Sequence, residues 1–335
     1  MNNPLVSVFI PVFNRELYVK KAIDSVLNQS YKNIEIIVLD DCSTDKSYLI
    51  VSNFMQLDVR IKLFKNPQNF GISKTRNIGL RYCSGKYIAL LDSDDFYEID
   101  KIEKQVNFLE SNLDYAAVSS WMQLFDDKCR LEIVKYRTDI EEIKAIIPFY
   151  SPVSHPASMF RSEVLKQLGY RENFIVAEDY DLWFRILQNY SIGVIPLVLY
   201  QYRIHEKQST HPDNFEIECL SNKLIASNIL EFFAIPNSSQ VVDFHVRYCM
   251  HSNNIETKEV FIKWDMHLRM FLNKNKHFFK DEVFKDFVFK NYWQTYYSEC
   301  VNELTLIEII KILASPFCLF YFTIKMKILI KKLLF

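Results

Sequence analysis

Three carboxylates stand close together in the segment LLDSDDFY, residues 90–97, directly after an apolar run. Side chains alternate along an extended segment, so Asp92 and Asp94 are expected to project to one side and Ser93 and Asp95 to the other. Mg²⁺ or Mn²⁺ takes one or two carboxylates and completes its shell with water and the phosphate oxygens of a substrate. The pattern therefore predicts a metal site that holds a diphosphate. The alternative is a solvated turn in which an aspartate caps the next helix.

Apolar runs rich in β-branched and aromatic residues alternate with stretches of helix length before and around this acidic cluster. The apolar runs are residues 5–13, 34–39, 60–64 and 86–91, and the helix-length stretches between them are residues 15–28, 45–56 and 73–83. This alternation predicts βαβ units that form a doubly wound, parallel sheet. Near-continuous apolar strands are typical of a sheet covered on both faces.

A polar cluster follows each of the predicted strands. The clusters are residues 11–15, 40–45, 66–71 and 92–95. Ligands of such sheets bind outside the carboxyl ends of the strands, so one crevice could receive all of these clusters. The turn after the first strand reads PVFNRE, without the glycines of a dinucleotide-binding turn, and a Walker lysine loop is absent from the sequence. Hydride transfer and ordinary P-loop ATPase chemistry therefore have no support.

The composition is that of a globular protein in a reducing compartment. The chain has 335 residues, of which 49% are hydrophobic, and its formal net charge of −1 gives no global field that would attract nucleic acid. The 7 cysteines are scattered and never form a C-x-x-C pair. This pattern, and an N-terminus without a positively charged segment before the apolar run, predict a cytoplasmic protein without a cleaved signal.

The composition changes along the chain. All five glycines precede residue 194, and the remainder reads as successive helical segments rich in Phe, Leu and Lys. We therefore place a boundary near residues 210–215. The prediction is an α/β domain over residues 1–212 and a helical C-terminal region over residues 213–335.

Four motifs occur in the order and at the spacing of a known enzyme family. They are SVFIPVFNRELYVKKAIDSVLNQSYKNIEIIVLDDCSTD, NFGISKTRNIGL, GKYIALLDSDDF and AEDYDLWFRI. Together they resemble the family 2 inverting glycosyltransferases over roughly residues 5–205. The resemblance implies the GT-A nucleotide-diphospho-sugar transferase fold, a doubly wound and mainly parallel sheet, here with a helical C-terminal extension.

The resemblance also implies a donor site, residue by residue. Asp41 would accept a hydrogen bond from the uracil N–H of a UDP-sugar, Asp94 would coordinate the metal, and Asp92 would contact the ribose. Asn69 and Arg76 would border the base and the diphosphate. The other residues expected in the nucleotide-sugar site are Pro11, Val12, Phe13, Asn14, Glu16 and Ser93. Two alternatives remain at this point: Asp41 as the cap of a helix, and Arg76 as a surface cation.

Inverting transfer needs a base that takes the proton of the acceptor hydroxyl while the leaving diphosphate is neutralised on the other side of the anomeric carbon. The resemblance assigns this role to Asp179, with Glu178 beside it. The alternative is a carboxylate that only favours the start of the following helix.

Further residues are expected on the diphosphate or acceptor side of the site. In the segment YRIHEKQST, the resemblance places Arg203, His205 and Ser209 near the diphosphate or the metal, with His205 as a second metal ligand. The alternative for His205 is a hydrogen-bonded histidine that binds no metal. His155 is a candidate on the acceptor side.

The C-terminal segment, residues 304–335, is both basic and hydrophobic. After Glu308 it contains five lysines and no acids, and its longest uncharged run, 13 residues over 312–324, includes Pro316. That run is short of the ~20 residues that a spanning helix needs. We expect peripheral contact with the cytoplasmic face of the inner membrane. A buried terminal helix or an oligomer contact is an equal alternative.

The sequence thus predicts a metal-dependent inverting glycosyltransferase of the hexosyl or N-acetylhexosaminyl class. It would use Mn²⁺ or Mg²⁺ and move a sugar from a nucleotide sugar, expected to be UDP-linked, to a glycan or a lipid-linked glycan. Assembly of surface polysaccharide or lipopolysaccharide is the expected setting, without a nucleic-acid partner. Two alternatives stay open: a nucleotidyl or phosphoryl transferase with the same acidic pair, and a non-catalytic module that binds nucleotide sugars.

Overall fold

A computed structural model describes residues 3–126, 128–205, 215–250, 257–275, 277–293 and 314–320. The chain forms two compact units. Unit 1 comprises Met1–Ile140 and Ser151–Ser221, and unit 2 comprises Glu141–Tyr150 and Asn222–Phe335. The predicted boundary between residues 212 and 213 lies outside the described residues and stays a prediction.

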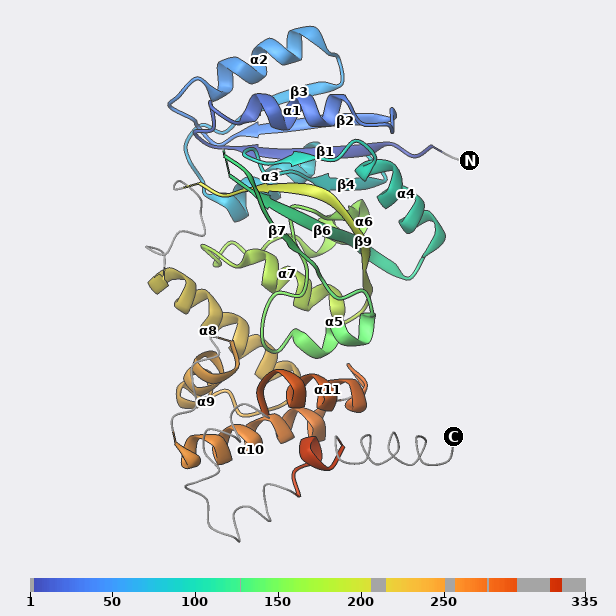
Figure 1. The fold of residues 1–335 in the computed structure, drawn as a ribbon. Helices are drawn as coiled ribbons and strands as arrows, with labels where there is room; N and C mark the ends of the chain where they lie inside the picture. The colour runs from blue at the N-terminus through green and yellow to red at the C-terminus, as the bar shows by residue number, and fades with distance from the viewer. Residues whose placement is uncertain are drawn as a thin grey trace, which may run out of the picture. The chain divides into compact units, whose positions relative to one another are not determined.

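The first half of unit 1 is a parallel sheet built from the predicted apolar runs. Its strands are β1 (Val6–Val12), β2 (Ile34–Asp40), β3 (Ile61–Lys65) and β4 (Tyr87–Leu90). They lie side by side in the order β3-β2-β1-β4 (Figure 1), with Val6 opposite both Ile34 and Tyr87. All seven residues of β2 are buried, as expected for a strand covered on both faces of the sheet.

The helices between these strands also follow the prediction. They are α1 (Val19–Leu27), α2 (Ser47–Leu57) and α3 (Ile72–Tyr82). The first helix begins later than residue 15, where the sequence placed it, because the chain after β1 forms a turn in which Asn14 has a φ of 53°. This turn matters for the site, since it places the residues that follow β1 at the carboxyl edge of the sheet.

A glycine allows α3 to lie close to β1. A Cβ atom at Gly79 would lie 2.1 Å from Cε2 of Phe9, whose side chain is completely buried. Only glycine therefore permits this approach of helix and strand without displacing the ring.

After β4 the sheet continues with strands of mixed direction. They are β5 (Phe96–Tyr97), β6 (Tyr115–Phe125), β7 (Arg130–Val134), β8 (Met159–Arg161) and β9 (Ser191–Arg203). Strand β8 is antiparallel to β4 and β6, whereas β9 is parallel to β6 and antiparallel to β5. The helices of this half are α4 (Lys101–Ser111), α6 (Ser162–Leu168) and α7 (Glu178–Leu187). The predicted doubly wound, mainly parallel sheet is confirmed, with a mixed second half.

Unit 2 is helical, as the sequence predicted for the C-terminal region. Its elements are α5 (Ile140–Ile146), α8 (Phe215–Phe232), α9 (Ser239–His245), a π-helical segment (Val246–Met250), α10 (Lys258–Lys274), α11 (Asp281–Val288) and a second π-helical segment (Phe289–Trp293). Its core is aromatic: the ring centroids of Phe233 and Phe271 are 5.1 Å apart, and those of Phe279 and Phe284 are 4.4 Å apart. Helix α5 precedes the last strands in sequence, yet all of its residues after Ile140 belong to unit 2, a grouping that the sequence analysis did not predict.

Only residues 314–320 of the predicted C-terminal tail are described. Within them, Phe317 and Cys318 are buried, and the Ser315 hydroxyl donates a hydrogen bond to Asp265 at 2.6 Å. This part of the tail therefore packs into unit 2. Among the helices that the structure describes, none combines the length and the apolar character needed to cross a membrane.

Candidate active site

A cavity of about 1630 Å³ opens at the carboxyl ends of the parallel strands in unit 1. Most of the residues predicted from the sequence line it. They are Pro11, Val12, Phe13, Asn14, Glu16, Asp41, Asn69, Arg76, Asp92, Ser93, Asp94, His155, Glu178, Asp179 and His205. Its volume exceeds the ~300–1,000 Å³ typical of small-molecule pockets, so it has room for a ligand larger than a typical small molecule. Of the remaining predicted residues, Arg203 lies beside this group and Ser209 lies outside the described residues.

The loop after β1 is tied to the loop after β2 by hydrogen bonds. The Asn14 backbone N–H donates to the Ser43 hydroxyl at 3.0 Å, and the Asn14 side-chain oxygen accepts from the Thr44 N–H at 2.9 Å. The Glu16 carboxylate accepts from the Lys46 N–H at 3.0 Å. Asn14 and Glu16 therefore fix the cavity wall, which leaves Phe13, 41% exposed, free to present its ring to a ligand.

Asp41 organises the third loop of the cavity. Its carboxylate accepts hydrogen bonds from the Asn66 side chain at 2.7 Å, from the Phe70 N–H at 3.0 Å and from the Gly71 N–H at 3.0 Å. Asn69 belongs to the same turn, and its side-chain oxygen also accepts from the Gly71 N–H at 3.0 Å. Asp41 is not a helix cap, the alternative considered above, because α2 begins only at Ser47.

The acidic segment after β4 is a turn and not the extended stretch that the sequence analysis assumed. The Asp95 N–H donates to the Asp92 carbonyl at 3.1 Å. Asp95 faces the interior, where it accepts from the Tyr200 hydroxyl at 2.8 Å and from the Arg203 N–H at 2.7 Å. Asp92, Ser93 and Asp94 all line the cavity, so the expected division is wrong for Ser93, because a turn replaces the alternation of an extended segment.

Asp94 lies between two basic side chains. One of its oxygens accepts from Arg15 Nε at 2.9 Å and contacts His205 Nε2 at 3.0 Å. The His205 ring packs on Tyr18, with centroids 4.8 Å apart, and the Arg203 guanidinium donates to the Asp94 carbonyl at 3.0 Å. Arg15 was part of a predicted polar cluster but not of the predicted site. A cation at the end of the first strand, opposite the acids, was the signal that could have identified it.

A second group of charged side chains also lines the cavity, formed by Arg76 of α3 and Glu178 at the start of α7. Arg76 pairs with Glu178, and its guanidinium is 3.5 Å from Asp92. Arg76 is only 7% exposed, so the alternative of a surface cation is wrong. The buried arginine thus links the Asp92 side of the cavity to the carboxylates that open α7.

Asp179 is held beside this pair with a perturbed acidity. Burial and, next, the negative charge of Glu178 raise the pKa of Asp179 to about 6, while Arg76 acts in the opposite direction. Its Oδ1 accepts from the Tyr180 N–H at 2.8 Å. Burial likewise raises the pKa of Asp92 to about 6. The Ala177 residue before α7 has a φ of 60°, a left-handed conformation that is unfavourable for alanine.

His155 lines the cavity but is only 2% exposed. Its Nε2 is 2.9 Å from the Tyr170 hydroxyl, and its ring packs edge-on against Trp183 at 6.0 Å between centroids. Burial holds the pKa of His155 well below its usual value. These contacts give His155 a packing role, and its predicted place on the acceptor side stays a prediction.

A family model described as glycosyl transferase family 2 matches residues 7–169. An uncharacterized glycosyltransferase of Haemophilus influenzae is 34% identical over 239 residues, which cover 68% of this chain and 74% of that protein. Another, from Methanocaldococcus jannaschii, is 36% identical over 214 residues, which cover 62% of this chain and 74% of that protein. The chain belongs to glycosyl transferase family 2.

Solved structures share the fold of this glycosyltransferase. Residues 1–349 of S. aureus TarS, in complex with UDP, superpose with a TM-score of 0.56 at 19% identity, over 88% of this chain and 86% of that one. A mannosyltransferase from Pyrobaculum calidifontis, in complex with GDP-Man and Mn²⁺, superposes with a TM-score of 0.54 at 14% identity, over 96% of this chain and 86% of that one. The predicted family, GT-A fold and enzyme class are therefore confirmed.

The glycosyltransferase has a further cavity residue that sequence reasoning missed. Tyr136 lines the cavity, and burial raises its pKa to about 12. Its backbone carbonyl accepts a hydrogen bond from the Trp121 indole at 3.0 Å. Tyr136 lies in the stretch between Asp114 and Tyr150, where the sequence shows no family motif, so only the folded chain reveals it.

Proposed function

We propose that this glycosyltransferase is a metal-dependent inverting enzyme that transfers a hexosyl or N-acetylhexosaminyl group from a UDP-sugar to a hydroxyl acceptor. The observation that carries the proposal is that Asp94, His205, Arg76 and Asp179 line one cavity. In an inverting displacement the base and the leaving group act on opposite sides of the anomeric carbon, so both sets of groups must face the same space.

The donor side is supported by the loops after β1 and β2. The exposed ring of Phe13 offers a surface on which a base can stack, and Asp41 holds the Asn66–Gly71 turn at the edge of the same cavity. A uridine base is favoured by the likeness to TarS, which has been solved with UDP and with UDP-GlcNAc. The mannosyltransferase relative binds GDP-Man, so a guanosine donor is the competing possibility that an assay must include.

Asp94 and His205 are the residues that would hold Mn²⁺ or Mg²⁺. Their facing atoms are 3.0 Å apart, close to the ~3 Å between adjacent ligands of an octahedral ion with bonds of ~2.1 Å. Two protein ligands leave the other positions for diphosphate oxygens and water. An ion bound there would neutralise the charge that develops on the departing diphosphate. Arg15, which contacts the same Asp94 oxygen, adds a fixed positive charge at this place.

Asp179 would take the proton of the acceptor hydroxyl. With its pKa at about 6, the carboxylate is ionised near neutral pH and still basic enough to assist the attack. The Tyr180 N–H holds Oδ1 at 2.8 Å, which leaves Oδ2 for the acceptor. Arg76 pairs with Glu178 and offsets its negative charge, which reduces the repulsion between the adjacent carboxylates of Glu178 and Asp179.

A donor screen tests this proposal. Release of the nucleotide (UDP, GDP or CMP) from UDP-, GDP- and CMP-sugars is measured with and without Mn²⁺ for the wild type, Asp179→Asn, Asp94→Ala and the exposed control Asp114→Asn. We expect a UDP-sugar to be preferred and Asp114→Asn to match the wild type. Asp179→Asn should keep donor affinity and lose at least ~100-fold in turnover, as loss of a general base does. Near-normal turnover of Asp179→Asn would remove it as the base.

We further propose that the acceptor is a glycan or lipid-linked glycan of surface polysaccharide or lipopolysaccharide assembly, met at the cytoplasmic face of the inner membrane. The support is the run of basic and apolar residues at 321–335, beyond the packed Phe317 and Cys318. Full-length protein should sediment with vesicles containing anionic lipid, and do so less at high salt. Equal sedimentation after Lys325, Lys327, Lys331 and Lys332 are changed to Gln would contradict membrane contact through the tail.

A further inference from the structure

Two imidazoles and a thiol converge in the helical core of unit 2, and the transfer reaction uses none of them. They are His245, Cys249 and His267, all buried, whose potential ligand atoms lie within 4.8 Å of one another. We propose that these three side chains form a binding site for a zinc ion. The proposal concerns different residues from the Asp94 site and does not depend on the proposed function.

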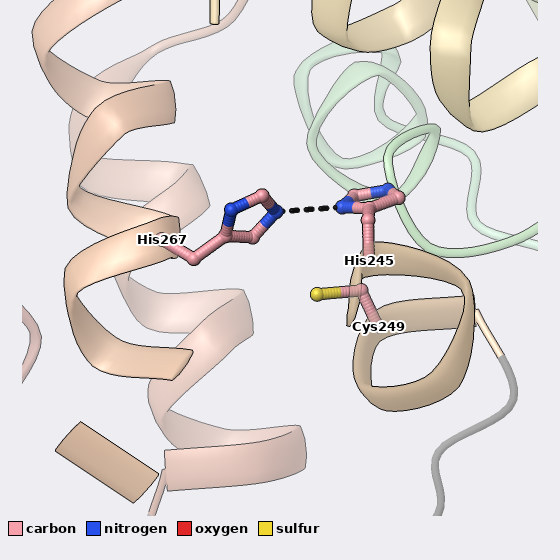
Figure 2. Close-up of side chains that lie close together, drawn as sticks. All are labelled: His245, Cys249 and His267. Atoms are coloured by element: carbon pink, nitrogen blue, oxygen red, sulfur yellow. Dashed lines mark hydrogen bonds between the residues drawn. The ribbon is translucent and has the colours of Figure 1, made fainter. Parts of the chain in front are cut away.

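The three side chains approach one another from two helices. His245 is the last residue of α9, Cys249 lies one turn further on in the π-helical segment, and His267 comes from α10. Figure 2 shows the two rings facing each other edge to edge, with the Cys249 sulfur directed to the same space between the helices. Residues four apart on a helix share a face, so His245 and Cys249 can act together. Short π-helical segments within helices are frequent at functional sites.

The hydrogen bonds of His245 leave its other nitrogen ready to bind a metal. Its Nε2 is 2.8 Å from the Pro148 carbonyl, which can only accept, so Nε2 carries the proton. In the neutral ring, Nδ1 then has a free lone pair, and it points at His267 Nε2, 2.9 Å away. A backbone carbonyl that fixes the tautomer and direction of a histidine is the usual support of a metal ligand.

The hydrogen bond between the two rings also fixes the tautomer of His267. Without metal, the proton between them belongs to His267 Nε2, which donates to His245 Nδ1. Zinc would replace that proton, and His267 would carry its hydrogen on Nδ1 instead. This change of tautomer releases no proton, and the proton released on zinc binding is that of the Cys249 thiol.

The distances require only a small adjustment. A tetrahedral zinc ion with bonds of ~2.0 Å to nitrogen and ~2.3 Å to sulfur separates its ligand atoms by roughly 3.3–3.6 Å. The two nitrogens at 2.9 Å must part slightly, and the sulfur must approach by at most ~1.5 Å from the 4.8 Å limit. Burial raises the pKa of the Cys249 thiol, so zinc would have to displace a proton that the free site holds firmly. Nitrogen and sulfur ligands select zinc over Mn²⁺ or Mg²⁺.

Such a site would join α9, α10 and the Glu141–Tyr150 segment of unit 2. Its expected effect is on stability, because zinc that binds only the folded chain raises the melting temperature.

The experiment uses the full-length, untagged chain with Asp94→Ala, so that divalent ions at the transfer site do not contribute. Zinc content, the cobalt absorption spectrum and the melting temperature are compared for this chain and for chains that also carry Cys249→Ser or His267→Gln. The matched control is Cys318→Ser, another buried cysteine of unit 2. We expect one zinc per chain, a sulfur-to-cobalt charge-transfer band and a rise in melting temperature of several degrees, all lost with Cys249→Ser or His267→Gln and kept with Cys318→Ser.

A cobalt spectrum without the charge-transfer band, or zinc content unchanged by Cys249→Ser, would overturn the proposal. If the variants do not fold, crystals of the parent chain soaked in zinc decide the question by anomalous scattering. A peak between His245 and His267 supports the site, and a well-ordered His245–His267 hydrogen bond without a peak refutes it.

Discussion

Replacement of Glu178 by glutamine should shift the pH dependence of transfer to lower pH. In the wild type the pKa of Asp179 is about 6, raised from 3.8 first by burial and then by the charge of Glu178. Asp179 must be ionised to act as the base, so kcat/KM should rise with pH up to about 6 and then level off. The substitution removes the negative charge beside Asp179 and leaves the positive charge of Arg76 less neutralised. Both changes favour the ionised form of Asp179 and so lower its pKa.

The expected fall in the pKa of Asp179 in Glu178→Gln follows from the effect of a neighbouring charge. A like charge within a few ångströms changes a pKa by about 1–3 units, and here burial, which remains, is the larger cause. We therefore expect the acidic limb to move down by about 1 unit, to about pH 5. At pH 5 about one tenth of the wild-type carboxylate is ionised, against about one half in Glu178→Gln. Relative to its own plateau, the variant should be about fivefold more active at that pH.

The assay measures nucleoside diphosphate release from pH 4.5 to 8.5 at saturating Mn²⁺, with each variant normalised to its plateau. The control Asp114→Asn should reproduce the wild-type profile. The plateau of Glu178→Gln itself should fall, because Arg76 loses its partner in a buried position. An acidic limb that stays at about 6 in Glu178→Gln, or that moves upward, would refute the assignment of Asp179 as the titrating base.

Three other perturbations test separate parts of the structure. Asp94→Ala should abolish the dependence of donor binding on Mn²⁺, seen by titration calorimetry, and an unchanged metal response would exclude Asp94 as a ligand. Gly79→Ala should destabilise unit 1 by about 1–3 kcal/mol in chemical unfolding, because its Cβ would meet the Phe9 ring at 2.1 Å, whereas Asn53→Ala on the exposed face of α2 should be neutral. Asp41→Asn should cost about 1–3 kcal/mol of stability as well as donor affinity, since the loop N–H groups lose an acceptor; an unchanged melting temperature would show that Asp41 does not hold the loop.

The residues at the carboxyl edge of the sheet could be predicted because the strands that precede them could be predicted. Strands β1 and β2 are covered on both faces, so their sequences are nearly unbroken apolar runs, and the polar clusters that follow them fall at the carboxyl edge of the sheet. The motif spacing then identified Arg76 and Asp179, which lie far apart in the sequence and line one cavity.

Other features depend on contacts that no local pattern encodes. The acidic segment is bent because Asp95 turns inward to Tyr200, a residue more than a hundred positions away. The pairing of Arg15 with Asp94 and the joining of Glu141–Tyr150 to the helical unit are likewise long-range. The cluster of His245, Cys249 and His267 could not be predicted for the same reason, because His245 lies in α9 and His267 in α10.

Residues with a left-handed backbone conformation at the cavity restrict which stabilising substitutions would keep the activity of this enzyme. Asn14 and Ala177 line the cavity at φ values of 53° and 60°, and Cys42 follows Asp41 at 63°. Glycine at position 177 would relieve the strain and gain a few tenths to about 1 kcal/mol, yet it would loosen the start of the helix that carries Asp179. Selection for heat resistance alone would therefore favour glycine there and erode turnover, so directed evolution of this scaffold needs an activity screen at every round.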